Sequence, residues 1–406
     1  MRVLLSTIGS RGDVQPILAL AVELRVLGHD ATLCVPPNFK EWVESFGLGC
    51  VPIGPDVKKL TGGTTPAPPP KPSKERRRQL AAYTIREQFQ VLTEAARGCD
   101  LIVGFAALQL AAPSIAEAFK IPYVFATYCP VTLPSPDHPP PRMDTHYPLW
   151  FPGAVNRLLW MRDGRRWNDL FGATLNEERA KCDLPPVASV QSYVFTDRPW
   201  LAADARLAPA ASAARGRIVQ TGAWFLPDRS VLTDALENFL ADGEPPIYFS
   251  FGSMRATDGT SRVLVDAARA VGRRSIISQG WGDLGAADDS SDCFAIGETN
   301  YELLLPRVAA AVHHGGAGTT TAAARAGKPQ VVAPHVYDQY YWAHRVAMLG
   351  VGVSGPTRDR LSVANLAAAL RDCLQPEPTT RARALASQID VNGARIAAER
   401  MIREFG

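Results

Sequence analysis

A glycine-rich run that starts with two histidines, His313 to Thr320, holds the residues of this chain best suited to binding an anion. It follows an apolar segment, 308–312, typical of a buried strand, and it precedes a segment, 321–326, typical of a helix that ends at Gly327. Glycines let backbone N–H groups approach a phosphate, and a helix N-terminus carries about half a positive charge. Glycines before a helix can also simply form the turn between a strand and the helix, without binding a ligand. Two histidines and several polar residues in one turn favour the phosphate site.

This run is neither the G-x-G-x-x-G of dinucleotide sites nor the G-x-x-x-x-G-K-[ST] of P-loops, so we expect a diphosphate site of another type. His313 is the weaker of the two histidines, because neighbouring residues at the end of a strand point in opposite directions. Three loops are expected to supply the diphosphate ligands: His314, Gly316, Ala317, Gly318 and Thr319 from this run, Ser10 and Arg11 near the N-terminus, and Ser253. Arg11 could instead be a solvated loop cation.

Asp13 is the candidate general base. It follows the first predicted strand, at the carboxyl edge of a parallel sheet where ligands of α/β proteins bind, and it stands three residues before Pro16. It could instead cap the helix that starts there, and the residues alone leave the two roles equal. A carboxylate of pKa about 4 cannot first deprotonate a phenol of pKa about 10 without a cost of roughly 8 kcal/mol, so proton transfer must accompany attack. This mildly favours a phenol over an aliphatic alcohol as the acceptor.

Polar and aromatic residues after other strands of the second half could bind the rest of a ligand that carries a diphosphate. Asp338 and Gln339 can exchange hydrogen bonds with sugar hydroxyls, although an aspartate there could simply form a turn. Trp281 would suit the face of a nucleobase, and buried aromatic packing is an equal alternative. Ile296 could hold the nucleobase through its backbone N–H and carbonyl groups.

The pattern of carboxylates argues against a metal site. No D-x-D pair follows a predicted strand, and no other cluster of carboxylates and histidines has the spacing of metal ligands. We therefore expect no metal ion and no other cofactor. A helix dipole, a histidine and an arginine would stabilise the leaving diphosphate instead.

Composition indicates a globular protein with room for two domains in its 406 residues. A net charge of +3 is too weak to indicate a nucleic-acid partner. The seven cysteines are scattered without metal spacing, which is typical of a reducing cytosol. The first residues are apolar for too short a stretch to form a signal peptide, and no run reaches transmembrane length. We expect a cytoplasmic protein without stable membrane insertion.

Strand and helix patterns alternate in both halves of the sequence, and they predict the elements that must position these residues. The first half begins with a strand, a loop and a helix at 2–7, 8–14 and 15–27, and continues with strands at 29–35, 100–104 and 122–126. The second half predicts strands at 246–253, 274–278, 293–296, 308–312 and 330–334. Such βαβ units imply parallel sheets with right-handed crossovers.

The domain boundaries follow from composition. We expect an N-terminal Rossmann-like domain over 1–224, a linker over 225–246, a second Rossmann-like domain over 247–380, and a C-terminal helix over 381–406. The stretch 379–405 is amphipathic and typical of a helix. Two unusual loops, 61–80 and 129–147, are rich in proline and belong to the first domain. Long loops over a rigid sheet tend to be functional, so we expect them to bind the acceptor.

Motifs along the whole chain carry a family likeness. The chain resembles the two-domain family 1 glycosyltransferases of the GT-B fold that modify secondary metabolites, and among them the actinobacterial glycopeptide-antibiotic glycosyltransferases. The segments that carry the likeness are 1–5 with 9–13, 221–224, 251–253, 280–281, 293–298, 313–320, 338–339 and 350–353.

The resemblance implies an α/β protein of two Rossmann-like domains, whose parallel sheets face each other across a cleft, with a C-terminal helix crossing back to the N-terminal domain. It implies an inverting, metal-independent transfer of a sugar from UDP-glucose or a TDP-sugar to a hydroxyl, phenolic in our expectation, of a glycopeptide aglycone or a similar aromatic natural product. Related enzymes carry a catalytic His or Asp at the place of Asp13. Aspartate here departs from the His-plus-Asp dyad of many plant-type relatives.

Three alternatives stay open at this point. A sterol- or lipid-type glycosyltransferase would use the basic cluster 74–78 near a membrane, although such a cluster is more often a solvated helix face. A nucleotide-sugar 2-epimerase shares the architecture, but it has no need of the two long loops. A catalytically silent helper of this fold would have lost its base or its diphosphate histidine, and this chain has both Asp13 and His314.

Overall fold

The computed structural model describes residues 1–61, 72–106, 108–143, 145–212, 217–253, 259–281, 284–285, 288 and 290–406. Most of the predicted acceptor loop 61–80 that precedes its helix, residues 62–71, lies outside the described residues, as does Asp144 of loop 129–147. Among the helices that are described, none combines the length and the apolar character needed to span a bilayer.

The described part of the N-terminal half contains a seven-stranded parallel sheet in the order β3-β2-β1-β4-β5-β6-β7. Because the strand order reverses between β1 and β4, the loops after these two strands flank the point where ligands of open α/β sheets bind. The strands are β1 (Arg2–Ser6), β2 (Asp30–Val35), β3 (Gly49–Pro52), β4 (Leu101–Phe105), β5 (Tyr123–Thr127), β6 (Trp200–Leu201) and β7 (Val219–Gln220).

Helices cover both faces of this sheet, and alternate residues of β1 point into the two layers: Val3 and Leu5 into one core, Leu4 into the other. The helices are α1 (Arg11–Val26), α2 (Lys40–Ser45), α3 (Val57–Thr61), α4 (Lys74–Ala95), α5 (Ala112–Phe119), α6 (Gly153–Trp167), α7 (Ala173–Lys181) and α8 (Val190–Phe195). Short helical turns, η1 (Pro37–Phe39), η2 (Pro130–Thr132) and η3 (Asn168–Gly172), lie between them.

Helix α1 begins earlier than the sequence predicts, and this changes the setting of Asp13. The expected loop 8–14 ends at Ser10, which caps a helix that starts at Arg11 rather than near Gln15. A capping box between Ser10 and Asp13 satisfies N–H groups that the first turn would leave unbonded. Asp13 therefore lies in the first turn of α1, and Pro16 lies inside the helix.

The second half repeats the pattern with a six-stranded parallel sheet in the order β10-β9-β8-β11-β12-β13, whose order reverses between β8 and β11. Its strands are β8 (Ile247–Ser250), β9 (Ser275–Ser278), β10 (Cys293–Ile296), β11 (Ala310–His313), β12 (Gln330–Val332) and β13 (Gly352–Ser354). Its helices are α9 (Asp234–Ala241), α10 (Thr260–Arg269), α11 (Tyr301–Leu304), α12 (Ala317–Arg325), α13 (Gln339–Met348), α14 (Val363–Cys373) and α15 (Pro376–Ala386), with turns η5 (Leu305–Arg307) and η6 (Arg358–Arg360).

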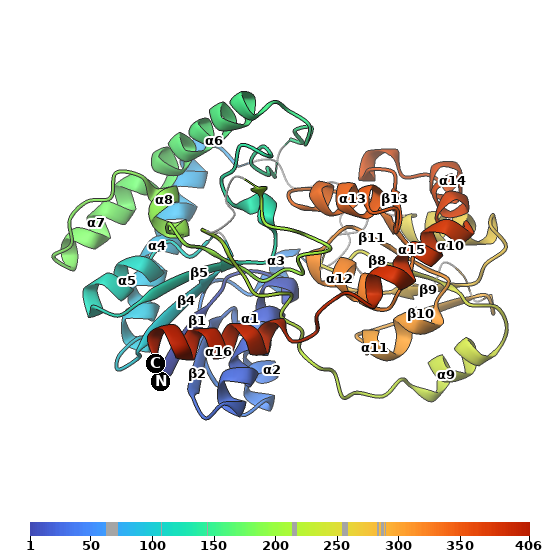
Figure 1. Cartoon of the computed structure of the whole chain (residues 1–406), viewed down its shortest axis with the longest axis horizontal. Helices are drawn as coiled ribbons and strands as arrows, with labels where there is room; N and C mark the ends of the chain where they lie inside the picture. The colour runs from blue at the N-terminus through green and yellow to red at the C-terminus, as the bar shows by residue number, and fades with distance from the viewer. Residues whose placement is uncertain are drawn as a thin grey trace.

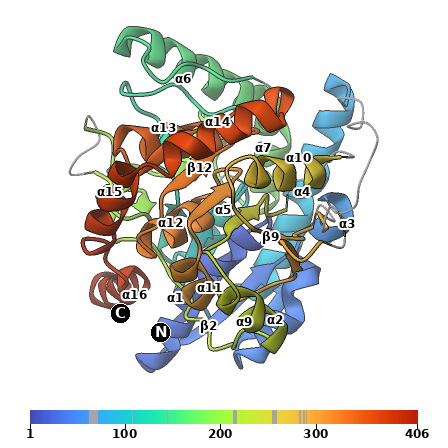
Figure 2. The same ribbon diagram turned by 90° about the vertical axis from the view of Figure 1, so that its right-hand side faces the viewer.

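The two domains lie side by side, and the last helix, α16 (Gly393–Phe405), returns to the N-terminal domain, where both chain ends meet (Figure 1). Figure 2 shows α16 lying next to α1 from another direction. Ala394, Ala397 and Met401 of α16 are buried in the same apolar core as α1 and β1. The predicted crossing of the C-terminal helix is thus present.

The predicted boundaries need adjustment at two places. The expected linker 225–246 contains α9, whose Leu236 and Leu240 pack with Tyr248 in the C-terminal core. The expected single helix 379–405 is two helices, and the predicted boundary at 381 falls inside α15. Ala382 of α15 still packs in the C-terminal half, so the chain crosses back only after α15 ends.

The two domains share one apolar cluster near these crossings. It joins residues of the N-terminal domain, such as Leu201 and Leu207, to residues of the C-terminal domain, such as Val332 and Trp342. The Asp390 N–H donates to the Asp204 carboxylate (3.2 Å), and this ties the segment between α15 and α16 to the N-terminal domain. The domains are therefore joined by a buried core as well as by the chain.

The first crossing and the last helix touch at two glycines. Gly222 has a left-handed backbone (φ +89°), and a Cβ at this position would lie 3.2 Å from the Gly393 Cα. A Cβ at Gly393 would in turn lie 2.5 Å from the Gly222 carbonyl carbon. Only glycine at both positions allows the two backbones to come so close.

Candidate active site

The two predicted catalytic groups follow strands at the switch points of the two sheets. Asp13 lies in the first turn of α1, after β1, and His314 directly follows β11. Interactions across the cleft show that these two sheet edges face each other. The Arg11 guanidinium pairs with the Glu298 carboxylate, and the charge of Asp13 acts on Asp338.

His314 fills a slot that only glycines leave open. A Cβ at Gly252, after β8, would lie 2.9 Å from the His314 ring carbon Cε1, and a Cβ at Gly316 would lie 2.7 Å from its Nε2. Burial lowers the pKa of His314 to about 4, so its imidazole is neutral at pH 7. Among the described residues its buried Nδ1 has no partner with hydrogen-bond geometry, although the Ser250 backbone lies near enough to raise the pKa of the ring slightly against the effect of burial. The ring can therefore exchange a hydrogen bond with a ligand without carrying a charge.

His313 plays a different part. Its Nδ1 accepts from the Gly315 N–H (3.1 Å), and its Nε2 lies 2.8 Å from the Gln330 Oε1. An accepting Nδ1 assigns the proton to Nε2, which donates to Gln330. The side chain is fully buried, and burial lowers its pKa to about 3. His313 therefore fixes the turn and does not reach the cleft.

Helix α12 presents its N-terminus at the same place. Gly316 is its N-cap residue, and Ala317, Gly318 and Thr319 form the first turn. The first intrahelical bond to this cap comes from the Thr320 N–H, so the amides of the first turn have no acceptor within the helix. The predicted diphosphate ligands of this run are brought together beside His314.

Asp13 has the capping role, and its surroundings would also suit the role of base, which stays a prediction. Its Oδ2 accepts from the Ser10 N–H (2.8 Å) and from the Ser10 hydroxyl (3.3 Å). Burial raises the pKa of Asp13 to about 6, against the lowering effect of hydrogen bonds from Ser10 and from the Tyr128 hydroxyl. The raised pKa narrows the gap to a phenol to about 4 units, or roughly 5.5 kcal/mol. Asp13 thus caps α1 and is also a stronger base than a free aspartate.

Asp338 and Gln339 begin α13 and hold their own loop. Asp338 Oδ2 accepts from the Trp342 Nε1 (3.0 Å), and Gln339 Oε1 accepts from the N–H groups of His335 (2.7 Å) and Val336 (3.0 Å). Burial, and then the charge of Asp13, raise the pKa of Asp338 to about 7. A partly protonated carboxyl at pH 7 can both donate to and accept from sugar hydroxyls.

Arg11 pairs with a residue of the C-terminal domain that lies outside the α12 turn. Besides its ion pair with Glu298, its guanidinium carbon lies 4.6 Å from the centre of the Trp42 ring. Trp281 packs against Phe39 of the N-terminal domain, with ring centres 6.0 Å apart. The alternative of aromatic packing therefore describes Trp281 in this state.

Two further predicted donor residues lie at the ends of strands of the same sheet. Ser253 follows Gly252 after β8, half-buried beside the His314 slot. Ile296 ends β10, and its carbonyl accepts from the Gln279 N–H (2.9 Å). The Ile296 carbonyl, one of the two backbone groups proposed to hold the nucleobase, thus already has a hydrogen-bond partner.

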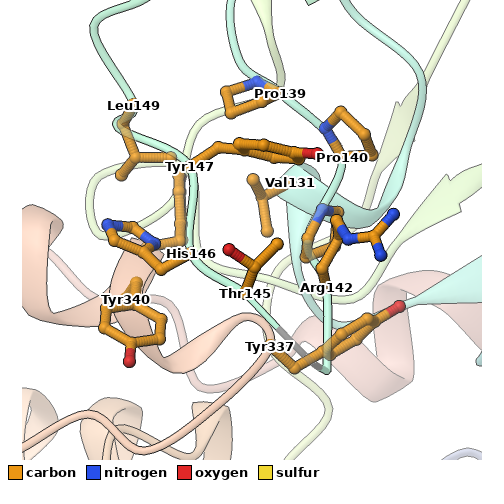
Figure 3. Close-up of a pocket in the computed structure, with 12 residues that line it drawn as sticks. Val131, Pro139, Pro140, Arg142, Thr145, His146, Tyr147, Leu149, Tyr337 and Tyr340 are labelled. Carbon is orange, nitrogen blue, oxygen red and sulfur yellow. The ribbon is translucent and has the colours of Figure 1, made fainter. Parts of the chain in front are cut away.

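Loop 129–147 reaches across the cleft. The Tyr337 N–H donates to the Arg142 carbonyl (3.2 Å), and the rings of His146 and Tyr340 stack at 3.9 Å with an interplanar angle of 15°. Figure 3 shows the pocket between this loop and the start of α13. Its lining comes from both domains: Val131, Pro139, Pro140, Pro141, Arg142, Thr145, His146, Tyr147 and Leu149 from one, and Tyr337, Tyr340 and Tyr341 from the other.

Sequence reasoning missed Tyr128, His335 and Tyr340. Tyr128 follows β5 and His335 follows β12, so the rule that selected Asp13, a polar side chain just after a strand, could have found both. Both ring nitrogens of His335 are buried without a partner, and its ring packs on Phe251 at 5.2 Å. Tyr340 does not follow a strand, and its ring contact with His146 comes from the opposite domain, so no local pattern in the sequence marks it.

Among the described residues, no three His, Cys, Asp or Glu side chains gather closely enough to hold a metal ion. The groups around the α12 turn that could meet an anion are the helix N-terminus, with its partial positive charge, and the neutral imidazole of His314. These groups stabilise a developing negative charge through hydrogen bonds and a dipole.

Two family models match the chain. The model described as the glycosyltransferase family 28 N-terminal domain matches residues 3–135, and that described as the erythromycin biosynthesis protein CIII-like C-terminal domain matches residues 297–394. Together these ranges include Asp13, His314, Asp338 and Gln339, but not residues 136–296.

Curated relatives match over nearly the whole length. The vancomycin aglycone glucosyltransferase of Amycolatopsis orientalis is 44% identical over 412 residues, covering 99% of this chain and 97% of the relative. The dTDP-epi-vancosaminyltransferase of the same organism is 41% identical over 392 residues, covering 94% and 92%. A solved structure, the glycosyltransferase of kitacinnamycin, superposes with a TM-score of 0.75 at 18% identity, covering 100% of this chain and 99% of the other, which shows a shared GT-B fold.

Proposed function

Since this chain belongs to the GT-B glycosyltransferases of the glycopeptide-antibiotic type, we propose that it transfers a hexose from UDP-glucose or a TDP-sugar to a phenolic hydroxyl of an antibiotic aglycone. The observation that carries the proposal is the placement of Asp13 and His314. Each follows a strand at the switch point of its own sheet, and the two edges share one cleft. A base on one wall and an anion site on the other are the two halves of a glycosyl transfer.

The reaction that fits this geometry is a single displacement. The acceptor oxygen attacks the anomeric carbon, the bond from that carbon to the diphosphate oxygen breaks with its electron pair, and the hydroxyl proton passes to the Asp13 carboxylate. Attack opposite the leaving group inverts the anomeric configuration. The α12 amides and the neutral His314 would bind the diphosphate as its charge grows.

Asp338 and Gln339 are proposed to hold the sugar, and Ser10, Arg11 and Ser253 to complete the diphosphate site from the loops after β1 and β8. Arg11 would have to exchange Glu298 for phosphate. Trp281 and Ile296 keep their proposed place near the nucleobase. We propose that the transfer needs no metal, because a helix N-terminus and hydrogen-bond donors already face the leaving group.

The acceptor proposal rests on the relatives and on the loops. Both named relatives above 40% identity carry names from the vancomycin series, which favours an aromatic antibiotic aglycone over a sterol or another lipid. Loop 129–147 lines an aromatic pocket next to Asp338. We also propose a soluble, cytoplasmic enzyme with no nucleic-acid partner.

The test is a matrix of donors and acceptors with product analysis. We expect sugar transfer from UDP-glucose or a TDP-sugar to an aromatic aglycone, with inverted anomeric configuration by NMR and activity unaffected by EDTA. Loss of activity with chelator and its rescue by magnesium would contradict the metal-free mechanism. Product formation with sterols and with no aromatic aglycone would instead favour a sterol- or lipid-type glycosyltransferase.

A further inference from the structure

We propose that Tyr340, on the donor domain, forms part of the acceptor site, where its ring stacks on an aromatic ring of the acceptor in the place now filled by His146. The proposal rests on the proposed function, because it assigns a contact to the acceptor of that reaction. It differs from the expectation drawn from sequence, which placed the acceptor on N-terminal loops only.

The first support is the geometry of the stack. The His146 and Tyr340 rings are nearly parallel, 15° apart in plane, with centres separated by 3.9 Å. This is the face-to-face arrangement that a planar ligand ring adopts on an aromatic side chain. Each ring comes from a different domain, so the contact exists only where the cleft is closed (Figure 3).

The second support is that the two partners differ in how they are held. Tyr340 lies in the first turn of α13, and its hydroxyl donates to the His335 carbonyl (3.4 Å). His146 lies in an irregular segment and is exposed. Tyr340 is therefore the fixed surface, and His146 is the side chain that can leave it.

The third support is position. Tyr340 stands two residues after Asp338, and Tyr337, which lines the same pocket, is close enough for the charges of Asp338 and Asp13 to act on its hydroxyl. An aromatic ring on Tyr340 would thus lie in the pocket that Tyr337 also lines, and Tyr337 connects this pocket to the two carboxyl groups. An acceptor with several rings could bind one here and present a hydroxyl of another to Asp13.

The chemistry of the lining indicates an aromatic occupant. The surfaces around Tyr340 are tyrosines, a leucine and three consecutive prolines, whose flat apolar faces pack well on rings. Met143 (68% exposed) and Trp150 (79% exposed) extend this apolar surface outward along the same segment. Large exposed apolar side chains next to a pocket are typical of ligand-binding surfaces.

The test uses opposite changes on the two sides of the stack. Tyr340→Ala should raise the KM for an aromatic acceptor about fivefold, the loss of one aromatic pair, with UDP or TDP affinity by calorimetry unchanged. Tyr340→Phe should keep the wild-type KM, because it retains the ring. His146→Ala should leave the acceptor KM unchanged or lower it, since it removes the side chain that fills the place. His344→Ala, an exposed position one turn later on α13, is the matched control.

A purely structural stack gives a different pattern. In that case Tyr340→Ala and His146→Ala would act alike on both melting temperature and KM, and this outcome overturns the proposal. An unchanged acceptor KM in a folded Tyr340→Ala protein overturns it as well. If the wild-type protein transfers no sugar to any aromatic acceptor, the proposed function itself fails. Donor hydrolysis measured without acceptor distinguishes this failure from a failure of the Tyr340 proposal alone.

Discussion

Asp13 and Asp338 come from different domains, yet the charge of one acts on the ionisation of the other. Both carboxyl groups have pKa values raised chiefly by burial, to about 6 and about 7. At pH 7 Asp13 is mostly ionised and able to accept a proton, whereas Asp338 is about half protonated. Two carboxyl groups with separated pKa values are a common basis for a division into base and hydrogen-bond donor.

Replacing Asp13 tests its role as base. Asp13→Asn keeps an oxygen that can accept from the Ser10 N–H, so α1 should stay capped. Turnover should fall by about 10²–10⁴, the range for loss of a general base, with nucleotide affinity little changed. Kinetics and calorimetry on the same preparation measure both quantities. Wild-type turnover in a folded Asp13→Asn protein would contradict the assignment.

The pKa of Asp13 also predicts a pH dependence. The base must be ionised, so kcat/KM for the acceptor should decline as the pH falls through about 6, rather than through the 3.8 of an ordinary aspartate. A pH–rate profile between pH 4.5 and 8 at saturating donor measures it. An acid limb that stays near pH 4 would mean that another group limits the rate.

His314 is expected to act on the donor rather than the acceptor. His314→Ala removes a ring from the slot between Gly252 and Gly316 and one hydrogen-bonding group from the diphosphate site. UDP or TDP affinity should fall roughly 10- to 150-fold, the value of one hydrogen bond to a charged group. Calorimetry against the exposed variant His344→Ala is the comparison. Equal affinities in the two variants would place the diphosphate elsewhere.

At the scale of elements, sequence periodicity predicted strands and helices well where one face is buried. The two parallel sheets and the α12 turn follow from apolar runs and glycines, and the structure confirms them. The returning helix was implied by the family resemblance, and it is present as well. The start of α1 was wrong by one turn. Glycines and a proline at 9–16 read as a loop, but the Ser10–Asp13 capping box stabilises a helix there.

Contacts between domains could not be predicted from the sequence. The pairing of Arg11 with Glu298 and the stacking of His146 on Tyr340 join residues far apart in the chain, and no local pattern marks them. The same holds for Trp281, whose neighbour Phe39 belongs to the opposite domain. Periodicity reports which face of an element is buried, but not which element covers it.

The close approach of Gly222 and Gly393 makes a prediction at this scale. Gly393→Ala would place a Cβ against the Ala223 carbonyl oxygen and the Gly222 carbonyl carbon, so α16 would have to shift away from the crossing. We expect a loss of stability of about 1–3 kcal/mol, the usual cost of overpacking. Chemical denaturation measures it. Gly285→Ala, where the added Cβ would meet open space, is the matched control, and equal stabilities would contradict the account.

At the scale of the whole molecule, buried titratable groups predict how stability varies with pH. Burial lowers the pKa of four histidines, His138 and His314 to about 4 and His313 and His335 to about 3. Each stabilises the fold fully above its unfolded pKa of about 6.5 and loses that contribution as the pH falls. Asp13 and Asp338, with raised pKa values, act in the opposite sense, because the folded state keeps their protons.

On these six groups the unfolded chain binds about two more protons than the folded protein near pH 5, four on histidines against two on aspartates. The free energy of unfolding should therefore fall by about 2.7 kcal/mol for each unit of pH lost there. Denaturant unfolding at pH 4.5, 5.0, 5.5 and 7.0 tests this. His138→Gln should reduce the slope by about one proton, and a flat profile would contradict the prediction.

The contact of Gly222 with Gly393 also determines how the cleft can open. The chain passes between the domains twice, and both passages run through this one place beside the shared apolar cluster of Leu201, Leu207, Val332 and Trp342. Because both connecting segments are held at this one point, we expect the domains to rotate about it rather than to separate. The ion pair of Arg11 with Glu298 and the ring contact of Phe39 with Trp281 lie outside that cluster. Phe39 is itself buried in the N-terminal core, and the half-buried Trp281 packs against it. We therefore expect a nucleotide sugar to enter on that side by separating these two contacts, while the shared apolar cluster stays intact.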